Sequence, residues 1–124
     1  MWAQAFEDVI LTKLRDVFKP NNIYWNEAFS ILQVHVLDQS KGAARFRWHR
    51  DTEEDTASMR VYYSCVILLR GDDKVAGLQV AGKQIATYGK HTGHIFDSRL
   101  YHSTQEVDGA GGVKLGVFVG LSLR

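Results

Sequence analysis

The sequence has very little cysteine or proline, and it lacks a long hydrophobic run. Its one cysteine, Cys65, rules out an intramolecular disulfide, so this is not a disulfide-stapled fold. No apolar stretch reaches the roughly 18 to 20 residues that a membrane-spanning helix needs, and residues 1–4 do not resemble the start of a signal peptide. We therefore expect a soluble intracellular protein, cytoplasmic or nuclear, that makes no membrane contact.

An excess of charge of one sign is also lacking, because 15 Lys and Arg residues face 14 Asp and Glu residues. Such a balance provides no overall basic field for nucleic acid, although Arg45, Arg47 and Arg50 could still meet phosphates locally. The acidic run at residues 51–55 is expected to be a solvated loop, with attraction of a basic substrate as the less favoured alternative. A length of 124 residues fits one domain, residues 1–124, which we expect to be a monomer or weak dimer.

One amphipathic helix is expected near the start, at about residues 3–18. Its apolar residues recur at helical spacing before Pro20 ends the pattern: Phe6, Val9, Ile10, Leu14 and Val17. Because residues at this spacing share one side of a helix, we expect this side to cover the core.

After the helix the hydrophobic period changes to that of strands, and a β core is predicted over about residues 29–123. Eight strands are expected, mostly separated by glycine-containing turns: 29–37, 44–49, 59–70, 77–81, 84–88, 94–96, 100–107 and 113–123. Since no helical crossovers separate them, the pattern predicts an all-β sandwich or jelly roll after one N-terminal helix.

The pair His49 and Asp51 is the first candidate for chemistry. Residues two apart on a strand point to the same side, so an imidazole and a carboxylate could converge on one ion. His-x-Asp is common by chance, and His102, in a later strand, adds the second imidazole that makes the pattern informative. Two histidines and one carboxylate leave open positions on a metal, as Fe(II) oxygenases require, whereas a closed structural zinc site needs four protein ligands.

Lys114 is a fourth candidate, at the head of the last apolar strand. A buried ammonium is costly unless an anion meets it, and a dicarboxylate would supply that anion. The alternative is a lysine that faces solvent at the end of a strand, which is the commoner outcome for an isolated lysine.

The order His49-x-Asp51, His102, Lys114 resembles the signature of the Fe(II)/2-oxoglutarate-dependent dioxygenase superfamily, and residues 62–79 and 93–96 are most similar to its prolyl-4-hydroxylase-like branch. The resemblance implies a double-stranded β-helix, which is a cupin-like jelly roll. It also implies that His49, Asp51 and His102 hold Fe(II), and that Lys114 pairs with the distal carboxylate of 2-oxoglutarate. Ascorbate is implied as a supporting reductant.

Two positions depart from the family pattern. Many relatives have arginine in place of Lys114, and the tyrosine that often binds the cosubstrate corresponds to Leu68 here. Tyr62 is the expected substitute, because it shares parity with Ser64 and Leu68 along its strand. Thr104 or Ser122 could supply the hydroxyl instead.

The activity implied by the resemblance is hydroxylation of a C–H bond, with succinate and CO₂ as coproducts and a protein or peptide side chain as the expected substrate. Two alternatives stay open: a dioxygenase acting on a modified nucleobase, and a catalytically silent jelly-roll binding domain. Other histidines are not expected to be ligands, because His91 and His94 would point to opposite faces of a strand and His35 reads as a residue of the core edge or surface.

Overall fold

A computed structural model describes residues 4–39, 49–70, 79–80, 83–84, 93–103 and 112–123. The elements in chain order are α1 (Gln4–Phe18), the 3₁₀ turn η1 (Lys19–Asn21), β1 (Ser30–Gln39), the 3₁₀ turn η2 (Asp51–Glu54), β2 (Met59–Arg70), β3 (Gln79–Val80), β4 (Lys83–Gln84), β5 (Gly93–Asp97), β6 (His102–Ser103) and β7 (Gly112–Ser122). The described part of the chain is therefore mostly β with one N-terminal helix, as predicted.

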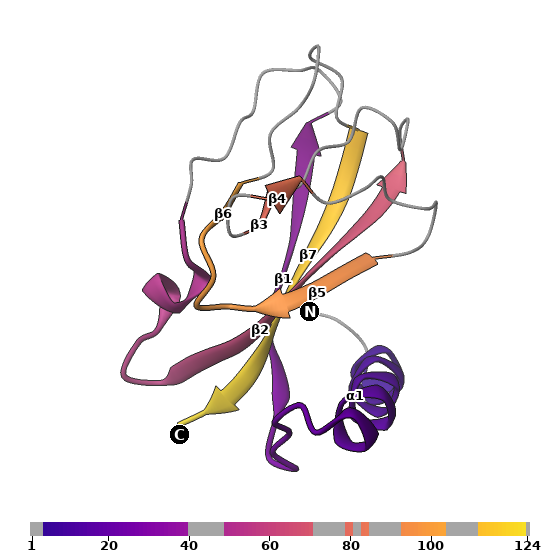
Figure 1. Ribbon diagram of the computed structural model, residues 1–124, viewed down its shortest axis with the longest axis vertical. Helices are drawn as coiled ribbons and strands as arrows, with labels where there is room; N and C mark the ends of the chain where they lie inside the picture. The colour runs from indigo at the N-terminus through magenta and orange to yellow at the C-terminus, as the bar shows by residue number, and fades with distance from the viewer. Residues whose placement is uncertain are drawn as a thin grey trace.

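The strands form two antiparallel sheets. The larger sheet has the order β1-β7-β2-β5, and the smaller one has the order β4-β3-β6. The larger sheet lies between α1 and the smaller sheet, so it presents a different neighbour to each of its faces (Figure 1). Strands distant in the sequence are thereby brought together, since β7 at the C-terminal end pairs with both β1 and β2.

The face of the larger sheet that is covered by α1, called its back, carries the hydrophobic core, and the opposite face is called its front. Its buried members are Phe18, Phe29, Ile31, Tyr63, Val117 and Val119. Edge-to-face contacts join Phe18 to Tyr63 at a ring-centroid distance of 4.9 Å and to Trp25 at 6.0 Å. Burial of these aromatic and β-branched side chains holds α1 against this face of the sheet. The opposite face carries a cavity.

The apolar side of α1 is rotated from the predicted one. Phe6, Ile10 and Leu14 pack against the core as expected, and so does Leu11. Val9 and Val17, however, are 52% and 55% exposed, so they do not belong to the buried side of the helix, although the spacing grouped them with Phe6, Ile10 and Leu14. The spacing of the apolar residues in α1 is compatible with more than one buried side, and the packing of the helix on the sheet decides which side is buried.

Four of the expected strands match the structure within a few residues, whereas others are shorter or fall partly outside the described residues. The strands expected at 77–81 and 100–107 are described only as β3 and β6, each two residues long. Residues 44–48 and 85–88 lie outside the described residues, while His49 forms an isolated bridge and Gln84 ends β4. The strand β1 continues to Gln39, two residues beyond the expected strand end at residue 37.

The helix in the described part of the chain is too short to cross a bilayer.

Candidate metal centre

Backbone hydrogen bonds bring together the three residues of the predicted metal triad. His49 and His102 form an antiparallel bridge, with N–H to O distances of 3.0 and 2.9 Å. The N–H of Asp51 donates to the carbonyl of Ser98 at 2.9 Å, which fixes the start of η2 beside the end of β5. The triad is therefore built on main-chain pairing between two segments that are far apart in the sequence.

The side chains of the triad converge as the sequence predicts. Asp51 lies between the imidazoles, with Oδ1 3.1 Å from Nε2 of His49 and Oδ2 3.3 Å from Nε2 of His102. One ligand atom from each residue lies within 4.8 Å of the others, and the two imidazole rings are 4.3 Å apart. Asp51 and His102 are buried, whereas the His49 side chain is 33% exposed, so the cluster opens to solvent on the His49 side.

Two further groups orient these side chains. The hydroxyl of Ser64 donates to Oδ2 of Asp51 at 2.5 Å. Nδ1 of His102 is 3.1 Å from the carbonyl oxygen of Leu100, and because a carbonyl can only accept, Nδ1 donates this hydrogen bond. Nε2 is the atom directed at Asp51, and it would be the metal ligand once it has no proton of its own.

The protonation equilibria of the centre follow from these contacts. Burial tends to raise the pKa of Asp51, but hydrogen bonds from His102 and Ser64 and the charges of both imidazoles bring it below its ordinary value. Burial tends to lower the pKa of His102, yet the Asp51 carboxylate and the Leu100 carbonyl raise it above its ordinary value. The carboxylate is thus ionised at neutral pH, as a metal ligand must be.

The triad opens into a cavity of about 620 Å³ on the front of the larger sheet. Its floor includes Ser64, Gly116 and Phe118, which register places on neighbouring strands. The mouth carries Arg50, whose guanidinium lies 4.9 Å from the centre of the Tyr101 ring, together with the exposed Glu53 and Glu54.

Lys114 is fully buried, at 0% exposure, in the central strand β7. It has the strand parity of Gly116 and Phe118, so it belongs to the front face, two residues beyond those lining the cavity. The alternative of a solvent-facing lysine is therefore wrong. Its pairing with a cosubstrate carboxylate stays a prediction.

Tyr62 is not brought to the triad. A β-bulge lies between Val61 and Tyr63, so Tyr62 does not share the parity of Ser64 on which its expected role was based. Its ring instead lies 5.1 Å from Phe29 and 5.7 Å from Tyr24, beside a second cavity of about 700 Å³. Nothing in this geometry supports Tyr62 as a cosubstrate ligand.

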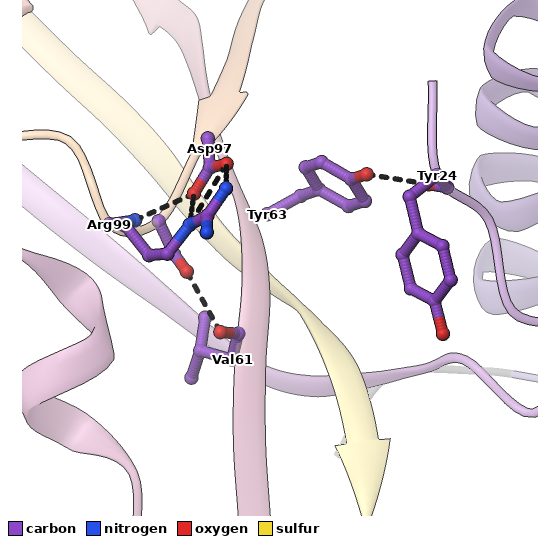
Figure 2. Close-up of polar contacts among 6 residues, drawn as sticks. Tyr24, Val61, Tyr63, Asp97 and Arg99 are labelled. Carbon is purple, nitrogen blue, oxygen red and sulfur yellow. Dashed lines mark hydrogen bonds and ion pairs between the residues drawn. The ribbon is translucent and has the colours of Figure 1, made fainter. Parts of the chain in front are cut away.

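Several polar contacts join residues that line the second cavity (Figure 2). The Tyr63 hydroxyl donates to the carbonyl of Tyr24 at 2.5 Å, and Arg99 pairs with Asp97 at 2.6 Å. The fully buried Ser98 donates its hydroxyl to the carbonyl of Val61 at 2.8 Å. Because the carbonyl of Ser98 also accepts from Asp51, this network supports the back of the triad.

The remaining candidates are placed as follows. Ser122 is exposed at the far end of β7, opposite Met59, while Thr104 and His91 lie outside the described residues. His94 lies on β5 opposite Val66 and is not part of the metal-ligand cluster found among the described residues.

His35 lines the triad cavity, which the sequence did not indicate. Ser64 and Ser98 were also missed, although a lone hydroxyl in the apolar run of β2 is a usable signal for Ser64.

No family model matches the chain, and no curated protein matches it. Among solved structures, the fold is similar to a prolyl-4-hydroxylase of Pseudomonas putida, with a TM-score of 0.49 and 16% sequence identity over 92% of this chain. The chain spans 63% of the length of that protein.

Proposed function

We propose that this protein is an Fe(II)- and 2-oxoglutarate-dependent dioxygenase that hydroxylates a C–H bond, with succinate and CO₂ as coproducts. The observation that carries the proposal is the convergence of His49, Asp51 and His102 around one point at the head of a cavity. The sequence order of these residues resembles that of the superfamily, and we further propose that the two sheets form its double-stranded β-helix.

The donor set fits the metal that the proposal requires. Two imidazoles and one carboxylate are the ligands of non-haem Fe(II) oxygenases, and they leave positions for a cosubstrate and O₂. A structural zinc site would need a fourth protein ligand, and the described residues near the triad do not include one within the cluster. Ser64 and the Leu100 carbonyl provide the outer hydrogen bonds that metal ligands commonly have.

Each residue then has a definite task. Asp51 and the two histidines would hold the metal, while Lys114 would attract the distal carboxylate of 2-oxoglutarate from the buried end of the front face. When bound, Fe(II) supplies the activation of O₂ that drives decarboxylation of the cosubstrate and hydroxylation of the substrate. The walls formed by Phe118 and Val66 would limit the access of water to this region.

We propose a protein or peptide side chain as the substrate. Among the described residues that line the cavity, Arg50 is the only lysine or arginine, and it is accompanied by Glu53 and Glu54. A surface that follows a phosphate backbone needs clustered basic residues instead. The exposed Val36 and Tyr101 near the mouth would suit contact with a polypeptide.

Metal binding and turnover test the proposal separately. Anaerobic titration with Mn(II), followed by 2-oxoglutarate, should give one metal site and a cosubstrate site that depends on it. We expect His49→Ala to weaken metal binding by at least about 100-fold. Lys114→Ala should spare metal binding but weaken 2-oxoglutarate binding, whereas Lys19→Ala, at an exposed lysine paired with Glu27, should change neither.

Succinate release with Fe(II), ascorbate and panels of peptides and oligonucleotides then tests the reaction. Stimulation by a peptide would support the proposed substrate class, and stimulation by an oligonucleotide alone would replace it with a nucleobase. If the wild-type protein bound neither Mn(II) nor 2-oxoglutarate, the enzyme proposal would be wrong and a binding domain would be the better description.

A further inference from the structure

His35 occupies the part of the front face that lies between the metal triad and Lys114. Along β7, Phe118 pairs with Ser64 beneath Asp51, Gly116 pairs with His35, and Lys114 lies one strand repeat further on. At roughly 3.3 Å per residue, Gly116 is about 6.6 Å along the strand from either neighbour on this face. A ligand that joins the metal to Lys114 must therefore pass over Gly116.

The imidazole of His35 already lies over this glycine. A Cβ atom at position 116 would be 2.4 Å from Nε2 of His35 and 2.9 Å from its Cδ2, so a side chain there would displace the ring. On its other side the ring makes an edge contact with Phe118, at a centroid distance of 5.1 Å. The absence of a side chain at Gly116 thus makes room for the His35 ring, so a ligand that passes this point must pass against that ring.

One nitrogen of His35 has no hydrogen-bond partner among the described residues. Its Nδ1 is buried, and it is unfavourable to leave a buried polar atom without a hydrogen bond. Burial lowers the pKa of His35, against the opposing charges of Asp51 and Glu54, so the ring is neutral at neutral pH and offers one N–H donor. A half-turn about Cβ–Cγ exchanges Nδ1 with Cδ2, which brings Nδ1 toward Gly116.

We propose that His35 is a cosubstrate-binding residue whose ring N–H donates a hydrogen bond to a carboxylate oxygen of 2-oxoglutarate over Gly116. The inference rests on the proposed function and supplies from β1 the contact that the sequence suggested for Tyr62 on β2. It also gives a physical reason for histidine and glycine at these paired positions. Occupation by the ligand would provide the partner that the ring lacks among the described residues.

Calorimetric titration of the Mn(II)-loaded protein with 2-oxoglutarate, without oxygen, tests this role apart from activity. His35→Ala should bind 2-oxoglutarate about 10- to 100-fold more weakly, the loss expected for a hydrogen bond to a charged group. Its affinity for Mn(II) should match that of the wild-type protein. His35→Gln, which retains an N–H donor, should recover part of the loss, and Lys19→Ala, at the exposed lysine paired with Glu27, should have no effect.

A spectroscopic measurement separates contact from a general effect on folding. In the Zn(II)-loaded protein, the ring-nitrogen NMR signals of His35 should shift when 2-oxoglutarate is added. Equal or tighter binding by His35→Ala, or unchanged nitrogen signals at saturation, would overturn the inference while leaving the proposed function intact. Failure of the wild-type protein to bind 2-oxoglutarate would instead remove the proposed function on which it rests.

Discussion

Ser64 controls the position of the Asp51 carboxylate through the 2.5 Å hydrogen bond between its hydroxyl and Oδ2. Without this bond, one oxygen of the buried carboxylate loses a donor and the side chain gains freedom to rotate. We expect Ser64→Ala to weaken Mn(II) binding about 10- to 100-fold, the usual effect of removing an outer hydrogen bond at a metal site. Equilibrium dialysis measures this change.

The matched control is Ser58→Ala, because the hydroxyl of Ser58 contacts Thr56 at the surface. This substitution should leave the affinity for Mn(II) unchanged. Equal metal affinity in Ser64→Ala and the wild-type protein would show that Asp51 is positioned by the Ser98 carbonyl and the histidines alone.

His102 makes metal binding sensitive to pH. Its pKa is raised from the ordinary value of 6.5, with the Asp51 carboxylate outweighing the opposite effect of burial. A metal binds the neutral ring, so protons compete below the raised pKa and are released when the metal binds. We expect the affinity for Mn(II) to fall by up to about tenfold per pH unit as pH is lowered through this pKa.

Titrations of Mn(II) between about pH 8 and about pH 6 would measure this dependence. The stability of the metal-free protein depends on pH in the opposite direction. A raised histidine pKa stabilises the folded state below the unfolded-state pKa, and this stabilisation is lost as pH rises through the folded-state pKa. An affinity for Mn(II) that stayed constant over the range would argue against His102 as a ligand.

At the scale of elements, the close approach of β2 and β7 depends on Gly120. A Cβ atom at this position would lie 2.0 Å from the backbone carbonyl oxygen of Arg60, at the register where Val61 faces Gly120 and the β2 bulge begins. A backbone atom cannot move aside as a flexible side chain can. We expect Gly120→Ala to lower the free energy of unfolding by about 1–3 kcal/mol, by the cost of overpacking.

Urea denaturation measures this loss, with Ser122→Ala on the exposed end of the same strand as the control. The bulge directs Tyr62 away from the triad and leaves the Tyr62 carbonyl to accept from the N–H of Ser98. Unchanged stability in Gly120→Ala would mean that β2 and β7 can separate locally without cost.

At the scale of the whole molecule, one face of the larger sheet packs the hydrophobic core and the other carries the candidate metal site. The back of this sheet is covered by α1 (Figure 1), and its front carries the triad cavity. Phe18→Ala should therefore lower the free energy of unfolding by about 3–5 kcal/mol, the cost of truncating a buried phenylalanine. Metal affinity should be unaffected, because this residue lies on the other face.

Thermal and urea unfolding with and without Mn(II) test this separation. At about 100 times its dissociation constant, a ligand specific for the folded state adds about 2.7 kcal/mol to stability. The wild-type protein and Phe18→Ala should gain the same increment, and Asp51→Asn should gain little because the carboxylate ligand is lost. A reduced increment in Phe18→Ala would show that the two faces are coupled.

The sequence by itself determined the chemical types in the site and the class of the fold. His49, Asp51 and His102 could be proposed because a metal demands particular donor types and because the order of these residues resembles the superfamily signature. The helix α1 and the longer strands could be predicted because their hydrophobic periods differ. Lys114 was predictable for a related reason, since a lysine within an apolar strand calls for an anion or a solvent-facing position.

Tertiary structure alone decided which candidate side chains meet. Strand parity predicted Tyr62 on the front face of the larger sheet. A bulge in the pairing of β2 with β7 instead turns Tyr62 away from that face, and the local sequence does not predict this bulge. The exposure of Val9 and Val17 was likewise set by how α1 rests on the sheet. His35 became a candidate only when β1 paired with β7 and laid its ring over Gly116, because long-range register is a property of two strands together and neither strand's sequence contains it.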